Sequence, residues 1–538
     1  MTMLPLELLD LVAACLQDSP PHLLPAALVC RTWSLVFTAR LWHSLHHPPI
    51  HRPDLVAQLP RQGCHTRTFT LIGSFDSALR DHVFASCPQL ISLDLTLAKS
   101  LDQVSIQLLV QCLPRLKVLR LNSCHGQKLA WLGGLHALES LRELDFVNSA
   151  AALVDQDQGQ EQEQDDPPAH NFGFASWSGS SELESTGTDS KDLAPDHLGS
   201  FLVARAHTLL RLDLGGSDLQ GFELFHDPVP GHGTPSVSSV AVDSSRHILA
   251  LRHLSLAETT VSSTGSIVEP LLRQCPELEY LDLSGNFDEA WSSFQWPILH
   301  SHCSSLKSLN VSKMSSIDNL QLVQVVKSCA GLDTLVAAQS NIASEVLEAI
   351  VERVSEWSPF LELDVSWCSG VSKVALQHIA EMVPTLQSFK LSWCPQADLS
   401  IFQGQWICNG LKVLEAQGLD GPSSVLAGFD LSWERCLFQR VSRLGCLQRL
   451  AIGSDEMVVS ETNGFDMATL QGLKQLQSLE LVGNEDHPLG LPELQALASA
   501  LVRLERFHFG LGLVEKKMQT WLAGARPDIK QIETQFYY

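Results

Sequence analysis

Residues 278–286 read LEYLDLSGN, and the spacing within this stretch decides the fold. Leucine stands at 278, 281 and 283, so an apolar residue is followed by a second three positions on and by a third two positions later. Fifteen copies of this spacing run through the 538-residue chain. They begin at positions 90, 116, 141, 209, 251, 278, 306, 332, 360, 386, 411, 447, 476, 504 and 529. Most steps are 25 to 29 residues, which indicates one structural unit repeated along the chain.

The spacing L-x-x-L-x-L resembles that of the leucine-rich repeat, whose units stack into a solenoid. Side chains alternate along a strand, so we expect the repeated leucines in the core and the residues between them on the concave face. Residues 320–329 (LQLVQVVKSC) and 345–354 (EVLEAIVERV) predict helices between the strands. Strands joined through helices are parallel. The predicted fold class is therefore α/β, a curved parallel sheet with helices outside.

Residues 1–50 do not follow the repeat and predict three short helices. The first carries an apolar stripe at i, i+4, i+7, i+8 and i+11, formed by Leu4, Leu8, Leu11, Val12 and Cys15. Pro5 suits the first turn of a helix, and the sequence DSPP at 18–21 ends it. A second apolar stretch covers residues 23–29. A third helical pattern follows and carries Cys30, Trp33 and Phe37.

The segments LPLELL, AALVCRTW and LW at this spacing resemble an F-box. The resemblance implies a three-helix module that binds a Skp-type adaptor and, through it, a cullin. By the same analogy, the adaptor-binding face holds Leu4, Pro5, Leu8, Val29, Cys30 and Trp33. An F-box followed by leucine-rich repeats is itself a known family arrangement, that of substrate receptors of SCF-type ubiquitin ligases. The alternative is that these helices only cap the first repeat.

The rest of the chain divides by composition. Residues 51–85 connect the module to the repeats and include a degenerate first strand near Phe69. Repeats then cover 86–150 and 199–538, with loop insertions expected near 221–245 and 421–443. Between the two blocks, residues 151–198 hold 11 acidic residues and one lysine, and we expect this insertion to be disordered.

The net charge of −24, from 60 acidic and 36 basic residues, argues against a general nucleic-acid binder and against binding to anionic membranes. No basic segment opens the chain, and no run of about 18 apolar residues occurs, so we expect no secretory signal and no membrane span. Many of the 14 cysteines keep register with the repeat, which predicts buried thiols rather than disulfides. The expected compartment is the cytoplasm, the nucleus or both.

The position between the second and third repeated apolar residues is acidic in seven of fourteen repeats, which predicts an acidic stripe on the concave face and a basic client protein. Trp367 and Trp393 occupy equivalent places in adjacent repeats and are candidate anchors. The alternatives are a merely solvated wall and tryptophans packed against the solenoid. The candidate client-binding residues are Asp213, Asp282, Asp364, Trp367, Lys390, Trp393 and Glu415.

No catalytic motif is present: there is no G-x-x-x-x-G-K-[ST], no G-x-S-x-G and no H-E-x-x-H. We therefore expect no enzyme activity of its own, no cofactor and no metal. The sequence favours a substrate-recognition subunit of an SCF-type (cullin–RING) ubiquitin ligase. The alternative is a non-enzymatic repeat scaffold or inhibitor that binds a protein partner and has no role with ubiquitin.

Overall fold

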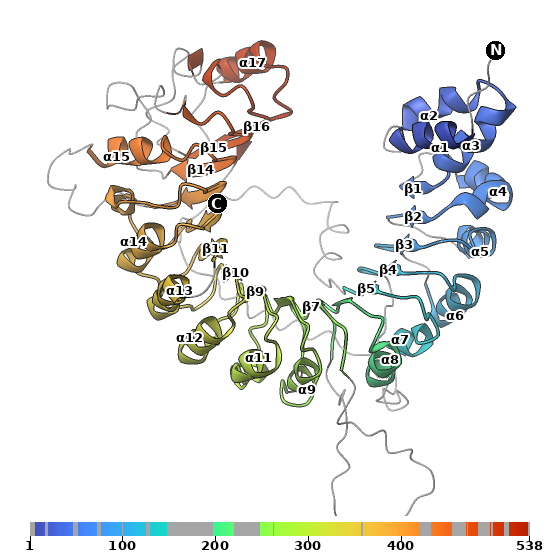
Figure 1. Ribbon diagram of the computed structural model, residues 1–538, viewed down its shortest axis with the longest axis horizontal. Coiled ribbons are helices and arrows are strands. Elements are labelled where there is room, and N and C mark those ends of the chain that lie inside the picture. The colour runs from blue at the N-terminus through green and yellow to red at the C-terminus, as the bar shows by residue number, and fades with distance from the viewer. Residues whose placement is uncertain are drawn as a thin grey trace, which may run out of the picture. The chain divides into compact units, whose positions relative to one another are not determined.

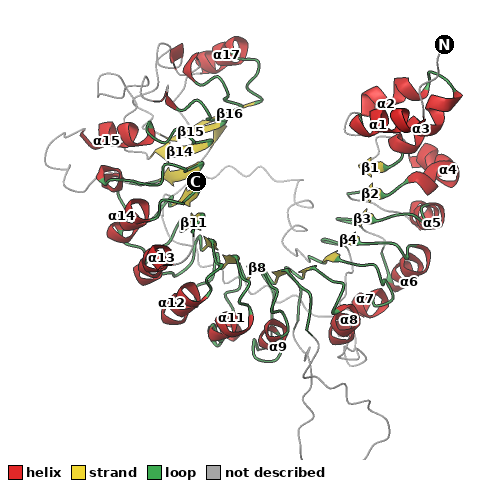
Figure 2. Cartoon of the chain, in the orientation of Figure 1, coloured by secondary structure: helices red, strands yellow, loops and turns green. Residues whose placement is uncertain are grey.

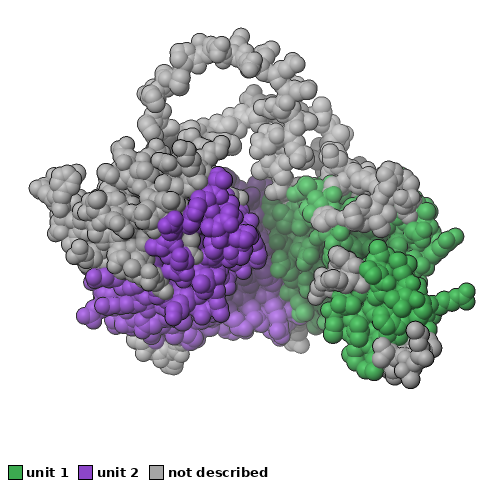
Figure 3. Space-filling model, turned by 90° about the horizontal axis from the view of Figure 1, so that it is seen from above, with its two compact units in different colours: residues 1–217, 221–247 green, residues 218–220, 248–538 purple. Residues whose placement is uncertain are grey.

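The computed structural model describes most of the chain. The described residues are 6–16, 20–46, 52–72, 77–98, 101–124, 130–147, 197–219, 248–261, 263–356, 359–419, 432–453, 470, 472–482, 495–496, 499–510 and 516–535. They belong to two compact units, which Figure 3 shows in different colours. Unit 1 comprises residues 1–217 and 221–247, and unit 2 comprises residues 218–220 and 248–538.

Unit 1 opens with three helices and continues with alternating strands and helices (Figure 1). Its described helices are α1 (Leu6–Cys15), α2 (Pro20–Ala27), α3 (Arg31–Leu41), α4 (Arg52–Gln62), α5 (Ser77–Ser86), α6 (Gln103–Cys112), α7 (Ala130–Leu135) and α8 (His197–Arg205), with a 3-10 turn η1 (Gly63–His65). Its described strands are β1 (Ser44–His46), β2 (Thr68–Thr70), β3 (Ser92–Asp94), β4 (Val118–Arg120), β5 (Glu143–Asp145) and β6 (Arg211–Asp213).

Unit 2 repeats the same strand–helix alternation (Figure 2). Its described strands are β7 (His253–Ser255), β8 (Tyr280–Asp282), β9 (Ser308–Asn310), β10 (Thr334–Val336), β11 (Glu362–Asp364), β12 (Ser388–Lys390), β13 (Val413–Gln417), β14 (Arg449–Gly453), β15 (Ser478–Val482), β16 (Arg506–Gly510) and β17 (Gln531–Gln535). Its described helical segments are α9 (Val268–Arg273), α10 (Glu289–Ser292), α11 (Pro297–His302), α12 (Asn319–Ser328), α13 (Ser344–Glu356), α14 (Lys373–Met382), η4 (Leu399–Gln403), α15 (Ser432–Val441) and α17 (Lys516–Ala525).

The strands of each unit form a parallel ladder, as the repeat predicts. In unit 2, Leu281 pairs with Leu309, Leu309 with Leu335, and Leu335 with Leu363 in the same register. All four side chains are fully buried, so each contributes about 1.5–3 kcal/mol of burial free energy. Figure 1 shows the strands of unit 2 on the concave side and helices α9–α14 outside them. The residues between the leucines therefore lie on the strand-lined face, which we call the wall of each unit.

Polar residues at the helix starts fix where the helices begin. Asp318 accepts hydrogen bonds from the backbone N–H groups of Leu320 and Gln321 at the start of α12. Ser372 does the same for Ala375 in α14. These side chains satisfy backbone donors that the first helical turn leaves without partners.

The repeated thiols are buried, as their register predicts. The set comprises Cys87, Cys124, Cys275, Cys303, Cys329, Cys368, Cys394 and Cys408. The three that stand eight residues after the first apolar position donate to backbone carbonyls of the preceding repeat: Cys124 to Leu95, Cys368 to Ala337 and Cys394 to Val365. The thiol at this position therefore links consecutive turns of the chain.

The structure adds detail to the segments that interrupt the repeats. Within the segment 51–85, residues 68–70 form β2, and α4 and α5 flank it. Strand β1, which lies inside residues 1–50, pairs with β2 through Leu45 and Phe69, so the parallel ladder begins earlier than the leucine spacing shows. Part of the insertion expected near 421–443 is helix α15. Residues 151–196 and 220–247 lie outside the described residues.

Candidate protein-interaction surfaces

The three N-terminal helices have an apolar core of their own. Leu9 and Ala13 of α1, Leu23 and Ala27 of α2 and Phe37 of α3 form one buried cluster. An ion pair of 2.8 Å between Asp10 and Arg40 also joins α1 to α3. Further apolar residues pack against this core, so the three helices are held together by contacts of their own. They are Leu16, Ala26, Trp33, Val36 and Leu41.

Other large apolar residues of the module are exposed. Leu8, Leu11 and Val12 of α1 are 47%, 61% and 43% exposed, and they lie on one face of the helix because they are three and four residues apart. Among the residues of the module whose burial is described, the other exposed large apolar side chains are those of Leu24, Leu28, Val29 and Leu35. We call these seven residues the N-terminal apolar set. Concentration of large apolar side chains on the surface of a soluble domain is typical of a binding site.

The residues proposed from the F-box resemblance take three kinds of position. Leu4 and Pro5 lie outside the described residues. Leu8, Val29 and Cys30 are exposed. Trp33 is half-buried: it packs against the module's core and stacks on Phe37 with ring centroids 5.2 Å apart.

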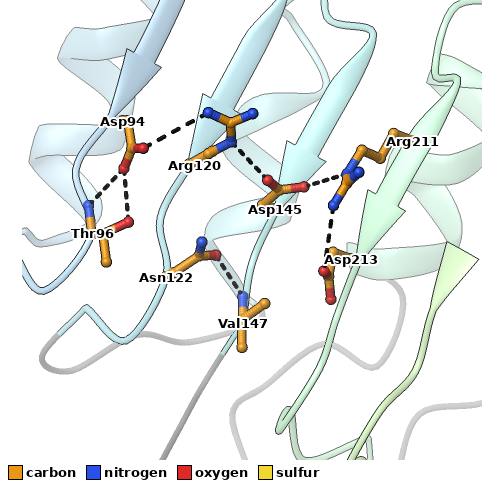
Figure 4. Close-up of polar contacts among 8 residues, drawn as sticks. All are labelled: Asp94, Thr96, Arg120, Asn122, Asp145, Val147, Arg211 and Asp213. Carbon is orange, nitrogen blue, oxygen red and sulfur yellow. Dashed lines mark hydrogen bonds and ion pairs between the residues drawn. The ribbon is translucent and has the colours of Figure 1, made fainter. Parts of the chain in front are cut away.

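The wall of unit 1 carries an alternating series of charges (Figure 4). Asp145 accepts from Arg120 on one side at 2.9 Å and from Arg211 on the other at 3.0 Å. Arg120 also lies 3.8 Å from Asp94, and Arg211 lies 4.0 Å from Asp213. The acidic residues here are therefore paired within the chain. Arg211 stands two residues before Asp213 and so lies outside the repeat position whose acidic residues predict the stripe.

Several wall carboxylates also support the turn that follows their strand. The side chain of Asp94 accepts from the backbone N–H of Thr96, two residues on. Asp213, Asp282 and Asp364 accept from Gly215, Ser284 and Ser366 in the same way. In unit 1, the Asn122 side chain similarly accepts from the backbone N–H of Val147 across the ladder, at 3.1 Å (Figure 4). These aspartates therefore have a structural role whether or not a partner binds them, because short polar side chains that accept from a nearby backbone N–H stabilise turns.

The wall of unit 2 holds a second charged group. Lys390 lies 3.7 Å from Asp364 of the neighbouring strand and 3.8 Å from Glu362. Arg449 contacts Glu415 at 3.0 Å. Burial nevertheless raises the pKa of Glu415, and the nearby carboxylates of Asp364 and Glu480 add to this effect, against the influence of Arg449 and Lys390. The raised pKa of Glu415 is therefore mainly a consequence of burial, which outweighs the lowering effect of Arg449 and Lys390.

Trp367 and Trp393 lie side by side, as their equivalent positions predict. Their indole rings stack with centroids 5.2 Å apart and planes at 18°. Trp367 is 52% exposed, whereas Trp393 is half-buried. Both have a left-handed backbone, with φ of 64° and 59°. This is the seventh residue after the first apolar position of each repeat, where positive φ recurs in glycines and in other residues. The set comprises Leu97, Ser123, Gly216, Glu258, Gly285, Lys313, Gln339 and Gly418.

The described residues show no sign of a metal centre. They contain no group of three or more His, Cys, Asp or Glu side chains that could hold a metal ion. Burial raises the pKa of the Cys124, Cys303 and Cys394 thiols to about 12. Such thiols are poor nucleophiles and poor metal ligands. Across the part of the chain that is described, every helix is too short or too polar to cross a bilayer.

Comparison with known proteins gives similar folds but no family. No protein-family model and no curated protein matches the chain. The complex of TLR13 with ssRNA13 is 13% identical with a TM-score of 0.44, covering 92% of this chain and 62% of that chain. The complex of Rad7 and Elc1 in yeast is 17% identical with a TM-score of 0.41, covering 53% of this chain and 69% of that chain.

A leucine-rich-repeat protein of Leptospira interrogans is 14% identical with a TM-score of 0.38, covering 90% of this chain and 98% of that chain. This chain spans 62% of the length of the TLR13 chain. The parallel strands β1–β16, each with a buried leucine or phenylalanine at the same register, have with the helices between them the architecture of leucine-rich repeats. The chain has an α/β fold built of leucine-rich repeats.

Proposed function

We propose that this chain is the substrate-recognition subunit of an SCF-type (cullin–RING) ubiquitin ligase. In this proposal α1–α3 form an F-box that binds a Skp-type adaptor, and the walls of the repeats bind a client protein. The chain performs no chemistry itself. It raises the effective concentration of client lysines near the ubiquitin carrier, because both partners are held on one molecule.

One observation carries the proposal: the N-terminal helices are held together by their own core and still expose the N-terminal apolar set. A module that served only as a cap would turn its largest apolar side chains toward the first repeat. Here Leu28 is 78% exposed and Leu35 is 75% exposed. Burying such side chains in a partner releases about 1.5–3 kcal/mol each, enough for a stable complex from a few of them.

The walls supply the second half of the proposed mechanism. The parallel strands fix the spacing of the residues between the leucines at about 4.8 Å from one strand to the next. Ion pairs such as Arg449 with Glu415 also hold the wall side chains in place. A polar, ordered surface of this kind favours recognition of a protein segment over chemical conversion of a small molecule.

The test is co-purification with a Skp-type adaptor. We expect the double variant Leu8→Asp/Val29→Asp to bind the adaptor at least about tenfold more weakly, because each carboxylate would have to be desolvated in the interface. The matched control is Leu320→Asp/Val374→Asp, which changes residues that are 77% and 70% exposed on helices α12 and α14. Trp33→Ala is less informative, because Trp33 packs in the module's own core.

The proposal fails if the purified wild-type chain and a Skp-type adaptor do not associate, or if the Leu8/Val29 variant binds as tightly as the control. Far-UV circular dichroism of both variants checks that the helix content of the chain is unchanged. A client assay then follows: proteins captured by the repeats should carry less ubiquitin in cells that express the Leu8/Val29 variant, although they remain bound.

A further inference from the structure

The position of Trp367 is not explained by packing within the chain. A bulky residue with a left-handed backbone costs about 1–2 kcal/mol relative to glycine, and this conformation recurs at the same place in other repeats, in Gly285 and Gly418 and also in non-glycine residues such as Leu97. A buried ring would repay this cost through the hydrophobic effect. Trp367 instead leaves 52% of its surface exposed, so its ring remains free to contact a partner.

The stacked neighbour holds this ring in a defined orientation. Trp393 is half-buried and lies against the backbone of Gly418, where a Cβ would overlap its Cε3, Cδ2 and Cζ3 atoms. Trp367 stacks on Trp393 at 5.2 Å. The pair therefore forms a ledge supported from one side, which we call the tryptophan ledge. Little side-chain entropy would be lost when a ligand stacks on it.

The surroundings of the ledge are acidic. Asp364 stands three residues before Trp367, which places their Cα atoms within about 10 Å along the strand and turn. Glu362 is on the same strand, and Glu415 lies two strands away on β13. Asp364 and Glu480 both act on Glu415, so the three carboxylates share one electrostatic environment. Lys390 and Arg449 compensate only part of this charge.

We infer that the tryptophan ledge and the carboxylates of β11–β15 bind an extended basic segment of a protein partner, with an arginine or lysine side chain stacked on Trp367. A cation is attracted to the face of an indole ring, and tryptophan is the strongest of the aromatic side chains in this respect. In an extended segment alternate side chains point the same way about 7 Å apart, so the next basic residue reaches the wall carboxylates.

This inference deepens the proposed function, on which its biological meaning rests, by naming the chemistry of the client. The same ledge would also stack a nucleic-acid base. The surrounding carboxylates would repel the phosphates of a nucleic acid, so the observations favour a peptide.

The test is equilibrium binding of the full chain to a fluorescein-labelled peptide of about 12 residues with alternating arginine and serine. Trp367→Ala should weaken binding by about 5- to 30-fold, the range expected for loss of a cation–π anchor. Phe287→Ala is the matched control, since Phe287 is a 69% exposed aromatic residue of the same unit. A peptide with citrulline in place of arginine keeps the shape and loses the charge, and should bind poorly.

A second pair of variants tests the wall. Asp364→Asn should weaken binding and reduce its salt dependence, whereas Glu258→Gln removes one exposed charge from the same edge of earlier repeats and should change neither. Equal losses for these two variants, or equal affinities of the Trp367 and Phe287 variants, would show general charge attraction and overturn the inference. So would tight binding of the citrulline peptide, or of an oligouridine probe in preference to arginine.

The outcomes are separable from those of the adaptor test. Trp367→Ala leaves the N-terminal apolar set unchanged, so adaptor binding should persist in this variant. Loss of peptide binding without loss of adaptor binding supports both proposals. Peptide binding that depends on Trp367 in a chain that binds no adaptor would uphold the inference and reject the ligase function.

Discussion

The indole ring of Trp393 occupies the place where a side chain of Gly418 would stand. A Cβ built on Gly418 would overlap three atoms of that ring, and the backbone at Gly418 has a φ of 61°. We therefore expect Gly418→Ala to destabilise the protein by about 1–3 kcal/mol, through backbone strain and displacement of Trp393. Urea unfolding measures this change in the free energy of unfolding.

Gly410→Ala is the matched control for that variant, because a Cβ at Gly410 meets nothing within 4 Å. Its free energy of unfolding should stay within about 1 kcal/mol of the wild type. In a Trp393→Ala background, where the ring is absent, Gly418→Ala should lower the free energy of unfolding by less than it does in the wild type. Equal effects at Gly410 and Gly418 would contradict the role given to the ring.

A buried arginine supports the helix end between two repeats. Arg353 of α13 is 2% exposed and donates to the backbone carbonyls of Val326, Cys329 and Leu332. Its guanidinium carbon lies 5.4 Å from the centre of the Phe360 ring. Arg353→Met fills the space but leaves these carbonyls without donors, and should cost about 3 kcal/mol.

The control for the arginine is Arg252→Met, whose side chain is 58% exposed and pairs with Glu277 and Glu279 on the surface. Removing an exposed pair of this kind should change stability by at most about 0.5 kcal/mol. Thermal unfolding of the two variants side by side measures the difference. An Arg353→Met protein as stable as Arg252→Met would show that water replaces the lost donors.

The charge series of unit 1 depends on Asp145. Its side chain is 8% exposed and is shared between Arg120 and Arg211. Asp145→Asn keeps the shape but leaves two partly exposed guanidinium groups without their common anion, which should cost about 2 kcal/mol. Amide hydrogen exchange should then speed up in β4, β5 and β6 specifically. Exchange that rises equally in unit 2 would contradict a local role.

The repeated leucines could be predicted from the sequence because their environment repeats. Leu281 and Leu309 are paired and buried for the same reason in adjacent repeats, so spacing alone identifies both. Helix α12 also falls within one residue of the segment predicted at 320–329. The pairing of Asp145 with Arg211 was not predicted, since the two residues are 66 positions apart and only the ladder brings them together.

The orientation of α1 shows a different limit. The sequence places Leu8, Leu11, Val12 and Cys15 on one apolar stripe, yet the core contacts come from Leu9 and Ala13. An apolar stripe predicts that a helix has a face to bury. It does not say whether the neighbouring helices or a separate partner will cover it, because that depends on how α2 and α3 pack against α1.

The carboxyl of Glu415 should make stability depend on pH in an unusual direction. Burial first, and then Asp364 and Glu480, raise its pKa above the usual value of 4.5, so the folded chain holds this proton more tightly than the unfolded chain. The resulting penalty is fully present above the folded-state pKa and disappears as the pH falls toward 4.5. The free energy of unfolding of Glu415→Gln relative to the wild type should therefore be highest near pH 7.

Urea unfolding of wild type and Glu415→Gln at several pH values between 7 and 4.5 measures this effect. The quantity of interest is the difference between the two free energies of unfolding, because other groups titrate equally in both proteins. This difference should decline steadily on acidification. A difference that grows as the pH falls would mean that Arg449 and Lys390 outweigh burial, and that the carboxylate is favoured in the folded chain.

The cysteines should separate into two classes of reactivity, and one of them reports on the proposed adaptor interface. Burial raises the pKa of Cys124, Cys303 and Cys394 to about 12, so at pH 8 about one thiol in ten thousand is a thiolate, and each is also shielded. Cys30 and Cys64 are exposed. Brief treatment of the native protein with iodoacetamide should therefore alkylate Cys30 and Cys64 and spare the buried three, as measured by mass spectrometry of peptides.

With a bound Skp-type adaptor, Cys30 should become protected by at least about tenfold while Cys64 continues to react, because Cys30 adjoins the exposed Val29 at the start of α3. Equal protection of both thiols would point to a general change in the protein, and unchanged reactivity of Cys30 would place the adaptor elsewhere.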